Sequence, residues 1–336
     1  ECSITFAQVY DIARNTGAYL IEQLGVDRTP VAVFAGRKMV TPAYFLGVAY
    51  AGRPYAPIDA SLPDKRIEKI LENLCPRAIV ADRESLEHVE SIVDELAKAE
   101  GFDRPQIFIA EDISRFEQVA CADSNCKISE SAGDAVTDSE NDMLATVRRQ
   151  MSMTDPLYII YTSGSTGNPK GVMTSHLSLM TYINAYCDVM HIEESDVLGN
   201  QSPLDYIAAI RDIYLPLKTG CSTAIIPKEY FMEPNALFDY MNDKKVSSVG
   251  WSVSAFTILT SLGAFEEVGL KSLRKICFSG SVMPCRVLRK WQENLPEAHF
   301  VNQYGPTEAT ASCTYYSVDH TVEDDEVLPI GKAYDN

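Results

Sequence analysis

An apolar stretch at residues 157–161 runs directly into a glycine-rich loop, and these two features constrain the fold more than any other part of the chain. Tyrosine and isoleucine fill the stretch, which predicts a strand buried in a sheet. The loop offers glycine N–H groups that can approach an anion closely, and its hydroxyl side chains and lysine add donors and charge. We therefore predict a phosphate-binding loop rather than a flexible surface loop. Its contact residues are Thr162, Ser163, Gly164, Ser165, Thr166, Gly167 and Lys170.

This loop differs from the Walker phosphate loop, because Lys170 stands between Pro169 and Gly171 instead of between a glycine and a hydroxyl residue. The whole string at residues 157–171 resembles the signature loop of the adenylate-forming superfamily. That superfamily contains acyl-CoA ligases, luciferases and the adenylation domains of nonribosomal peptide synthetases. The string looks most like the synthetase domains and their D-alanine-activating relatives.

A second motif, Asn-Gln-Tyr-Gly-Pro-Thr-Glu at residues 302–308, follows the apolar stretch 298–301. The resemblance implies that Tyr304 stacks on adenine, that Thr307 reaches the phosphate and that Glu308 helps to hold Mg²⁺. An aromatic face suits a purine, and a carboxylate oxygen suits Mg²⁺. Taken alone, the segment could also be a Gly-Pro turn with an incidental acid, but the order of the two motifs argues against this. The resemblance further assigns nucleotide contacts to Ser279, Gly280, Ser281, Asn302 and Gly305.

Weaker matches extend the resemblance over nearly the whole chain. Residues 46–59 look like a conserved helix end that runs into a strand, and residues 329–332 look like the last stretch before the family's small barrel. Near the start, Thr5 and Gln8 fit the first segment of the family. They also form the pattern of a capping box, in which each side chain bonds the other residue's backbone N–H.

Strand and helix patterns alternate along the chain, which predicts βαβ units and mostly parallel sheets. The acidic, serine-rich segment at 121–150 predicts an exposed loop or a partly disordered segment. Helices are expected at 5–24, 64–74, 176–190, 234–244 and 284–294, and strands at 31–34, 78–81, 223–226, 246–251, 273–278 and 298–301.

The resemblance implies an α/β fold of two stacked, doubly wound, mostly parallel sheets in a five-layer αβαβα arrangement. The chain (1–336) is then expected to be the truncated N-terminal core of an adenylation domain, without the family's barrel and C-terminal domain. Its approximate halves are a phosphate-loop half at 46–184 and a substrate and adenine half made of 1–45 plus 185–336. Ligands of such folds bind at the carboxyl ends of strands, which is where both motifs stand.

The composition narrows the possible partners. A net charge of −18 argues against nucleic acid, because a surface that binds its backbone needs cationic side chains. No apolar run approaches the ~20 residues that span a bilayer, and no signal peptide is visible, which predicts a cytoplasmic protein that does not bind membranes. The nine cysteines and five histidines show no metal-ligand spacing. Several cysteines, such as Cys221 and Cys277, fall in apolar runs and are expected to be core residues of a reduced protein.

The resemblance implies a reaction in which the carboxylate of an acid joins the α-phosphate of ATP and pyrophosphate leaves. Positioning and charge neutralisation carry such a transfer, with catalytic roles for Lys170, Thr307 and Glu308. In a peptide synthetase the acyl group then passes to the phosphopantetheine thiol of a carrier-protein domain. The alternatives are a free-standing acyl-CoA or D-alanine–carrier ligase and a catalytically silent binding domain on the same fold. Weak or no activity is expected from this chain alone.

The segment 206–212 aligns with the part of the family that holds an amino-acid substrate. Ile207 replaces the aspartate that pairs with the substrate ammonium, and an isoleucine cannot pair with a charge. On a strand, Asp205 would share a face with Ile207 and could take over this role. Otherwise Arg211 meets a carboxylate or another acceptor of the substrate, or forms a surface ion pair with Asp212.

The substrate class therefore stays open between amino acids, β-amino acids, hydroxy or keto acids and aryl acids. The pocket implied by the resemblance is lined by Asp205, Ile207, Ala208, Arg211, Gly250, Cys277, Ser279, Gln303, Ala311 and Ser312.

Overall fold

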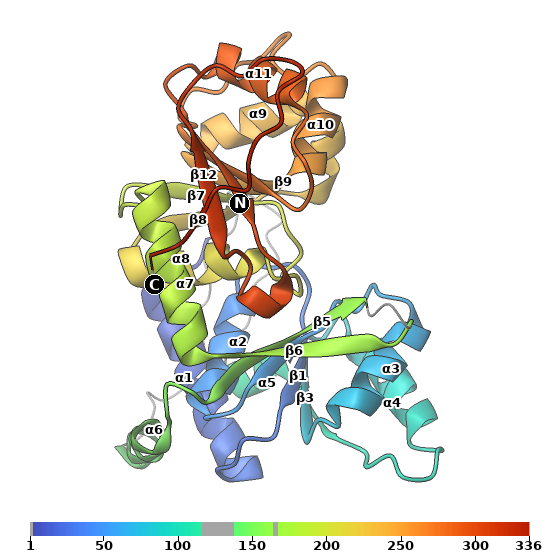
Figure 1. The fold of residues 1–336 in the computed structure, drawn as a ribbon. Coiled ribbons are helices and arrows are strands. Elements are labelled where there is room, and N and C mark those ends of the chain that lie inside the picture. Colours follow the sequence, from blue (N-terminus) through green and yellow to red (C-terminus); the bar gives the residue numbers. More distant parts are fainter. Residues whose placement is uncertain (1–2, 116–137, 164–166, 336) are drawn as a thin grey trace. The chain divides into compact units, whose positions relative to one another are not determined.

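The computed structural model describes residues 3–115, 138–163 and 167–335, and at 138–142 it describes the backbone only. The chain divides into two compact units, Glu1–Leu177 and Ser178–Asn336, and each is built around its own sheet (Figure 1). Both sheets are mostly parallel and carry helices, which confirms the predicted α/β class. The boundary differs from the predicted halves, because residues 1–45 fall in the first unit. Their strand pairs with two strands of the first sheet.

The first unit holds a six-stranded sheet in the order β4-β3-β1-β2-β5-β6, in which β5 and β6 pair antiparallel and the other neighbours pair parallel. Its strands are β1 (Val31–Phe34), β2 (Tyr55–Pro57), β3 (Ala78–Ala81), β4 (Gln106–Ile109), β5 (Pro156–Ser163) and β6 (Pro169–Ser175). Its helices are α1 (Phe6–Leu24), α2 (Thr41–Tyr50), α3 (Asp64–Leu74), α4 (Leu86–Leu96), α5 (Ala110–Ser114) and α6 (Asp138–Gln150).

Alternate residues of a strand face opposite sides of this sheet. Ala32 and Phe34 pack in one buried cluster with the apolar faces of α3 and α4. Helix α1 packs against α2, α5 and α6. The predicted limits of α1 are confirmed, because Thr5 and Gln8 form the capping box and the helix ends at Gly25, whose φ is 70°.

The second unit holds a seven-stranded sheet in the order β13-β12-β11-β10-β9-β7-β8, in which β12 pairs antiparallel with both of its neighbours. Its strands are β7 (Val197–Asn200), β8 (Ser222–Ile225), β9 (Ser248–Ser252), β10 (Lys275–Ser279), β11 (His299–Tyr304), β12 (Thr314–Val318) and β13 (Lys332–Ala333). Its helices are α7 (His176–Met190, which starts at the boundary), α8 (Ala209–Thr219), α9 (Pro234–Asp243), α10 (Val253–Ser261) and α11 (Cys285–Asn294), with 3-10 turns η1 (Lys228–Met232) and η2 (Thr307–Ala309).

The two faces of the second sheet differ in character. Ile276 and Phe278 of β10 belong to a large apolar cluster with side chains of α9, α10 and α11, and this cluster contains the buried Trp251 and Trp291. Cys277 alternates with them and points to the opposite face, where it lies beside α7. Polar side chains gather on that second face.

The acidic segment predicted to be a loop is partly helical. Residues 138–150 form α6, and the part of the prediction at 121–137 lies outside the described residues. Leu144 and Val147 are buried against the rest of the first unit, and this burial outweighs the poor helix-forming composition.

Two other expectations concern segments next to the motifs. Residues 169–175 form the strand β6, which pairs antiparallel with β5 as the second strand of a hairpin. Lys170 therefore lies on a strand and not in a loop. Residues 204–208 form turns that lead into α8, and the strand on which Asp205 and Ile207 would share a face does not form. Ile207, Ala209 and Ile210 are instead buried on the approach to α8 and in its first turn.

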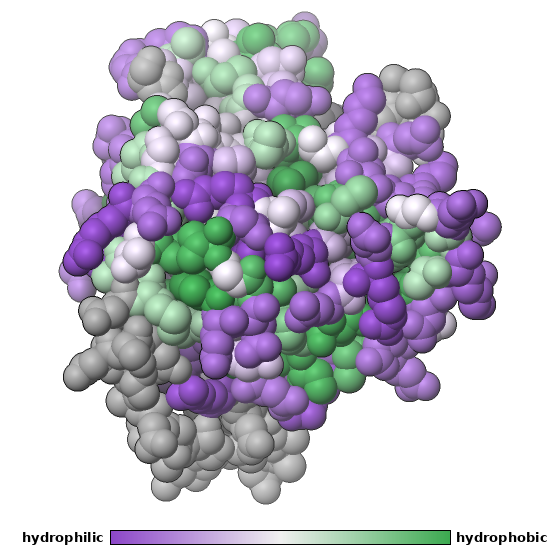
Figure 2. Space-filling model, turned by 90° about the horizontal axis from the view of Figure 1, so that it is seen from below, coloured by the Kyte–Doolittle hydropathy of each residue, from purple (hydrophilic) through white to green (hydrophobic). Residues whose placement is uncertain are grey.

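Figure 2 shows one face of the molecule, which is largely hydrophilic with several separate apolar areas. Among the described residues, no helix is long and apolar enough to cross a membrane.

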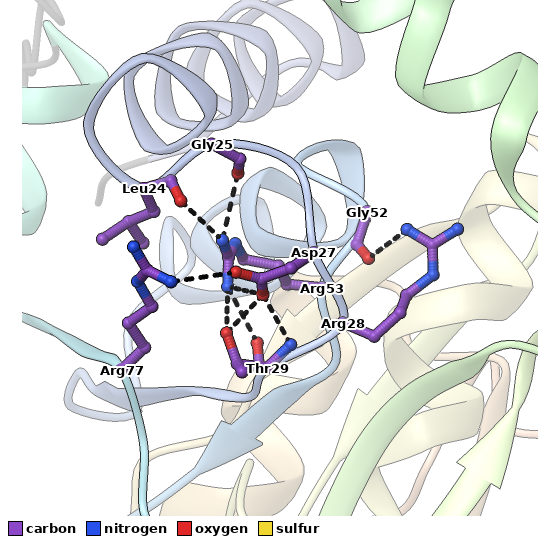
Figure 3. A network of polar contacts seen from close by, with 8 residues as sticks. All are labelled: Leu24, Gly25, Asp27, Arg28, Thr29, Gly52, Arg53 and Arg77. Atoms are coloured by element: carbon purple, nitrogen blue, oxygen red, sulfur yellow. Dashed lines mark hydrogen bonds and ion pairs between the residues drawn. The ribbon is translucent and has the colours of Figure 1, made fainter.

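A buried arginine fastens the end of α1 to the turn before β2. Arg53 is 1% exposed, and its Nη2 donates to the carbonyl oxygens of Leu24 at 3.2 Å and Gly25 at 3.0 Å (Figure 3). Its Nη1 bonds Asp27 and Thr29. The guanidinium thereby satisfies carbonyl groups that a helix end leaves without partners and holds the loop that leads into β1.

Candidate functional site

The glycine-rich loop joins the two strands of a hairpin. Strand β5 is buried at Leu157, as predicted, and β6 returns antiparallel at the edge of the sheet. Thr162 and Lys170 face one another across the hairpin, and Thr162 Oγ1 lies 3.5 Å from the carbonyl oxygen of Lys170. Ser163, Gly167 and Lys170 are exposed. The predicted contacts Gly164, Ser165 and Thr166 lie outside the described residues.

Helix α3 supports this hairpin through two side chains that sequence reasoning missed. Lys69 Nζ donates to Asn168 Oδ1 at 3.0 Å and to the carbonyl oxygen of Gly167 at 3.4 Å. The Tyr161 hydroxyl donates to Asn73 Oδ1 at 2.8 Å. Lys69 and Asn73 share one face of the helix, which a periodicity argument could have noted, but their partners lie 88 residues or more away in the sequence.

The second motif begins on β11 and ends in η2. Tyr304 closes the strand with its side chain 52% exposed, so that its ring is accessible. The chain then folds back tightly, and the N–H of Cys313 donates to the Tyr304 carbonyl oxygen at 2.9 Å. A Cβ on Gly305 would lie 2.4 Å from the Cα of Ser312. Glycine is therefore required at this position by the packing of the loop on itself.

The metal candidate Glu308 lies on η2 and is exposed. In the ranges that the structure describes, no group of three or more His, Cys, Asp or Glu side chains could hold a metal ion. Mg²⁺ is commonly bound by one or two carboxylates together with phosphate oxygens, and a single exposed carboxylate fits that donor set.

Other predicted nucleotide contacts are placed as follows. Asn302 is buried, and its Nδ2 donates to the carbonyl oxygen of Pro329 at 2.9 Å, so its amide holds the segment that leads to β13. Ser279 ends β10, and Gly280 turns the chain there with a φ of 95°. Gly280 and Ser281 are exposed at the carboxyl end of that strand.

Several predicted substrate residues meet on the face of the second sheet that Cys277 shares. The strand register places Gly250, Cys277 and Val301 side by side, and Gln303 lies further along β11 on the same face. Arg211 of α8 reaches this row, because its Nη2 donates to the Gly250 carbonyl oxygen. A Cβ on Gly250 would lie 2.3 Å from Arg211 Nε, so only glycine leaves room for the guanidinium.

We call this group the Arg211 cluster: Tyr182, Tyr186, Arg211, Gly250, Cys277, Gln303, Ser312 and Tyr334. The Arg211 guanidinium lies over the ring of Tyr186, 5.7 Å from its centroid. Ser312 Oγ lies 3.4 Å from Gln303 Oε1, and the rings of Tyr182 and Tyr334 are 6.4 Å apart.

Four buried polar atoms of the Arg211 cluster have no hydrogen-bond partner among the described residues. They are Arg211 Nε, Gln303 Nε2 and the hydroxyl oxygens of Tyr182 and Tyr334. Burial raises the pKa of Tyr182 to about 12 and that of Cys277 to about 11. At neutral pH both groups keep their protons, and the cluster is rich in donors.

The remaining predicted substrate residues lie around the approach to α8 and the loop after η2. Ile207 is buried and Asp205 is half-buried in the turns before α8. Ala208 is the N-cap of α8, and Ala311 has a φ of 76° in the tight loop after η2. Residue 207 therefore presents an apolar group where an acid would be needed to pair with an ammonium.

Comparison with known proteins gives one family match over the whole chain: the family described as AMP-binding enzyme matches residues 1–336. The D-alanine–D-alanyl carrier protein ligases of Bacillus anthracis and Bacillus cereus (strain AH820) are 28% identical to the chain over 333 residues. These alignments cover 98% of this chain and 59% of each relative, so the chain spans about three-fifths of their length.

Solved structures share the fold. The Vibrio cholerae adenylation domain AlmE, in complex with glycyl-adenosine-5'-phosphate, has a TM-score of 0.75 and 20% identity, covering 99% of this chain and 60% of that one. The four-domain nonribosomal peptide synthetase holo-AB3403, bound to AMP and glycine, has a TM-score of 0.73 and 19% identity, covering 98% of this chain and 21% of that one.

Proposed function

Because the chain belongs to the family of AMP-binding enzymes, we propose that it is the nucleotide-binding and acid-binding part of a ligase that activates a carboxylic acid with ATP. The observation that carries this proposal is the match of the whole chain to that family. The exposed Ser163, Gly167 and Lys170 of the hairpin support it, as do the exposed Tyr304 and Glu308, since both sets offer accessible groups of the right chemistry next to the end of a strand.

In this proposal the two motifs bind one nucleotide. The hydroxyl and backbone donors of the β5–β6 loop, together with Lys170, hold the β- and γ-phosphates. Tyr304 stacks its accessible ring on adenine, and Thr307 donates to the α-phosphate. Gly280 and Ser281 present backbone groups to the purine. Asn302 contributes by holding the chain behind the motif, since its amide is engaged with Pro329.

Glu308 would hold Mg²⁺, which neutralises phosphate charge when it is bound. The chain's own residues align the acid with the α-phosphate. An oxygen of the substrate carboxylate bonds to the α-phosphorus while the bond to the bridging oxygen breaks, and pyrophosphate leaves with both electrons of that bond. The products are an acyl-adenylate and pyrophosphate, and no covalent bond to the protein forms.

We further propose that the acyl group passes to the phosphopantetheine thiol of a carrier protein in the cytoplasm. A peptide synthetase is one setting, which the fold of the synthetase AB3403 supports. A free-standing carrier-protein ligase is the second, which the names of the Bacillus relatives support. A carrier domain in the same polypeptide as this chain would favour the synthetase, and a separate carrier protein would favour the ligase.

The test is ATP–pyrophosphate exchange by the protein that carries this chain, with a panel of carboxylic acids, together with binding of AMP-PNP to the chain itself. We expect exchange with at least one acid. Lys170→Ala and Glu308→Gln should each weaken AMP-PNP binding about tenfold, whereas the exposed control variants Lys65→Ala and Glu297→Gln should not. Background exchange with every acid, with AMP-PNP still bound, would instead support a silent binding domain.

A further inference from the structure

The Arg211 cluster contains a positive charge in a place where water cannot reach it. Arg211 is 2% exposed, and Gln303 and Ser312 beside it are also buried. Burying an ionised group without full hydrogen bonding is costly, and proteins normally complete such a group with acceptors. The cluster lies wholly within the second unit, on one face of its sheet.

The chain supplies too few hydrogen-bond acceptors to compensate the buried charge of the Arg211 guanidinium. Its Nη2 donates to a backbone carbonyl, and within the described part of the chain its ion pair is with Asp212, whose Oδ1 lies 3.9 Å from Nε. That distance is too long for a hydrogen bond, and Asp212 also accepts one from Asn200 Nδ2 at 2.8 Å. Nε itself has no hydrogen-bond partner among the described residues.

The other unpartnered groups of the cluster can also donate. Gln303 Nε2 is a pure donor, and the Tyr182 and Tyr334 hydroxyls each carry a proton. All three side chains are more than nine-tenths buried, with exposures of 2%, 3% and 5%. Three such donors beside the buried guanidinium, together with its own unpartnered Nε, form an environment that suits an oxygen acceptor and repels an ammonium group.

We propose that the acid activated at this site carries a second oxygen acceptor, foremost a second carboxylate, on the end that enters the Arg211 cluster. This inference rests on the proposed function, because it takes the carboxylate that reacts with ATP as given. Arg211 and Tyr182 then determine specificity, by completing their hydrogen bonds only with a substrate that brings acceptors.

The inference separates this chain from a protein that selects a plain amino acid through its ammonium. Ile207 adds no charge that could hold an ammonium, and the guanidinium of Arg211 would oppose one in its cluster. A substrate carboxylate would pair with the Arg211 guanidinium. A methyl group in its place would leave Arg211 Nε, Gln303 Nε2 and the two tyrosine hydroxyls without hydrogen-bond partners.

The experiment compares three non-hydrolysable acyl-sulfamoyl adenosines that share a five-carbon acyl chain and differ only at its far end. The glutaryl compound ends in a carboxylate, the valeryl compound in a methyl group and the 5-aminovaleryl compound in an ammonium group. Isothermal titration to the chain should show glutaryl binding at least about tenfold tighter than valeryl, and 5-aminovaleryl binding weakest. A four-carbon series of succinyl, butyryl and 4-aminobutyryl compounds covers the shorter acids.

Arg211→Met should abolish the preference for the carboxylate, and Arg286→Met, on the exposed side of α11, should leave it unchanged. Because Arg211→Met removes a buried group, Tyr182→Phe provides a second variant that loses only a hydroxyl. It should weaken the glutaryl compound about threefold or more and leave the valeryl compound unaffected.

Tighter binding of the valeryl or ammonium compound in both series, or an unchanged preference in the folded Arg211→Met and Tyr182→Phe proteins, would overturn the inference. So would AMP-PNP binding without binding of any acyl compound. Loss of AMP-PNP binding as well would instead count against the proposed function.

Discussion

The guanidinium of Arg211, on α8, donates a hydrogen bond to the backbone carbonyl oxygen of Gly250, in the middle of β9. The two residues are 39 positions apart in the sequence, and their contact holds the helix over the second sheet. The contact exists because Gly250 has no side chain, since a Cβ there would lie 2.3 Å from Arg211 Nε and 2.5 Å from Cζ.

Replacing Gly250 with alanine should displace this guanidinium. We expect Gly250→Ala to lower the free energy of unfolding by about 1–3 kcal/mol, the usual cost of overpacking a core, because the new methyl group and the guanidinium cannot share the space. Urea unfolding followed by circular dichroism measures the change. Gly269→Ala is the matched control, because a Cβ there meets nothing within 4 Å. Equal stability of the two variants would contradict the packing described for Arg211.

Lys69 should order the hairpin that we assign to phosphate binding. Lys69→Ala removes the donor to Asn168 and Gly167, so we expect weaker AMP-PNP binding, by about threefold to tenfold. Because Lys69 anchors the end of an exposed hairpin, global stability should change by less than about 0.5 kcal/mol. The neighbouring exposed Lys65→Ala serves as the control in the same titration. A large loss of stability with unchanged binding would show that Lys69 has a purely structural role.

Acidification should destabilise the protein through two half-buried histidines. Burial lowers the pKa of His299, and the nearby His191 and Lys275 lower it further. Burial also lowers the pKa of His176. The unfolded chain therefore binds more protons than the folded chain, so stability is full above about pH 6.5 and falls as the pH drops through the folded-state values.

The comparison of His299→Gln with the parent protein isolates this contribution. The hydrogen bond that the His320 ring donates to the Glu326 carboxylate raises the pKa of the exposed His320, and this residue acts in the opposite direction in both proteins. Urea unfolding at pH 7.5 and pH 5.5 should show a smaller acid-induced loss of stability for the variant. An equal or larger loss would show that His299 is not the group that titrates.

Arg53 should be indispensable to the first unit. Arg53→Met leaves the carbonyl oxygens of Leu24 and Gly25 without this donor and leaves the exposed Arg77 as the charged partner of Asp27 (Figure 3). We expect the free energy of unfolding to fall by about 3 kcal/mol, as when one partner of a buried charge network is removed. Arg286→Met, at an exposed position, should change it by less than about 0.5 kcal/mol. Differential scanning calorimetry shows whether the loss of stability is confined to one unfolding transition.

Sequence patterns predicted the helices whose ends and faces are set by residues a few positions apart. The capping box of Thr5 and Gln8, the glycine stop at Gly25, the amphipathic α3 and the start of α7 at His176 all form as expected. Each depends on residues a few positions apart, and tertiary packing reinforces the same choice.

Elements that depend on distant partners could not be read in the same way. Strand β6 contains Lys170 and Gly171, which are typical of a loop, and it forms because β5 offers an antiparallel edge. Helix α6 has an unfavourable composition but buries Leu144 and Val147.

The same limit applies to the candidate site. The motifs named Lys170, Tyr304 and Glu308, but nothing local indicated that Lys69 supports the hairpin. Nothing local placed Arg211 over Gly250 either, because this contact depends on the register of β9 and β10 and on the packing of α8 against them.

The central claim is that the hairpin after β5 and the segment at Tyr304–Glu308 bind one and the same nucleotide. A crystal structure of the chain with an acyl-sulfamoyl adenosine tests it most directly. The account predicts adenine against Tyr304 and the sulfamoyl group near Thr307, with the hairpin residues around Lys170 reaching the same ligand. A nucleotide bound by only one of these two segments, or by neither, would contradict it.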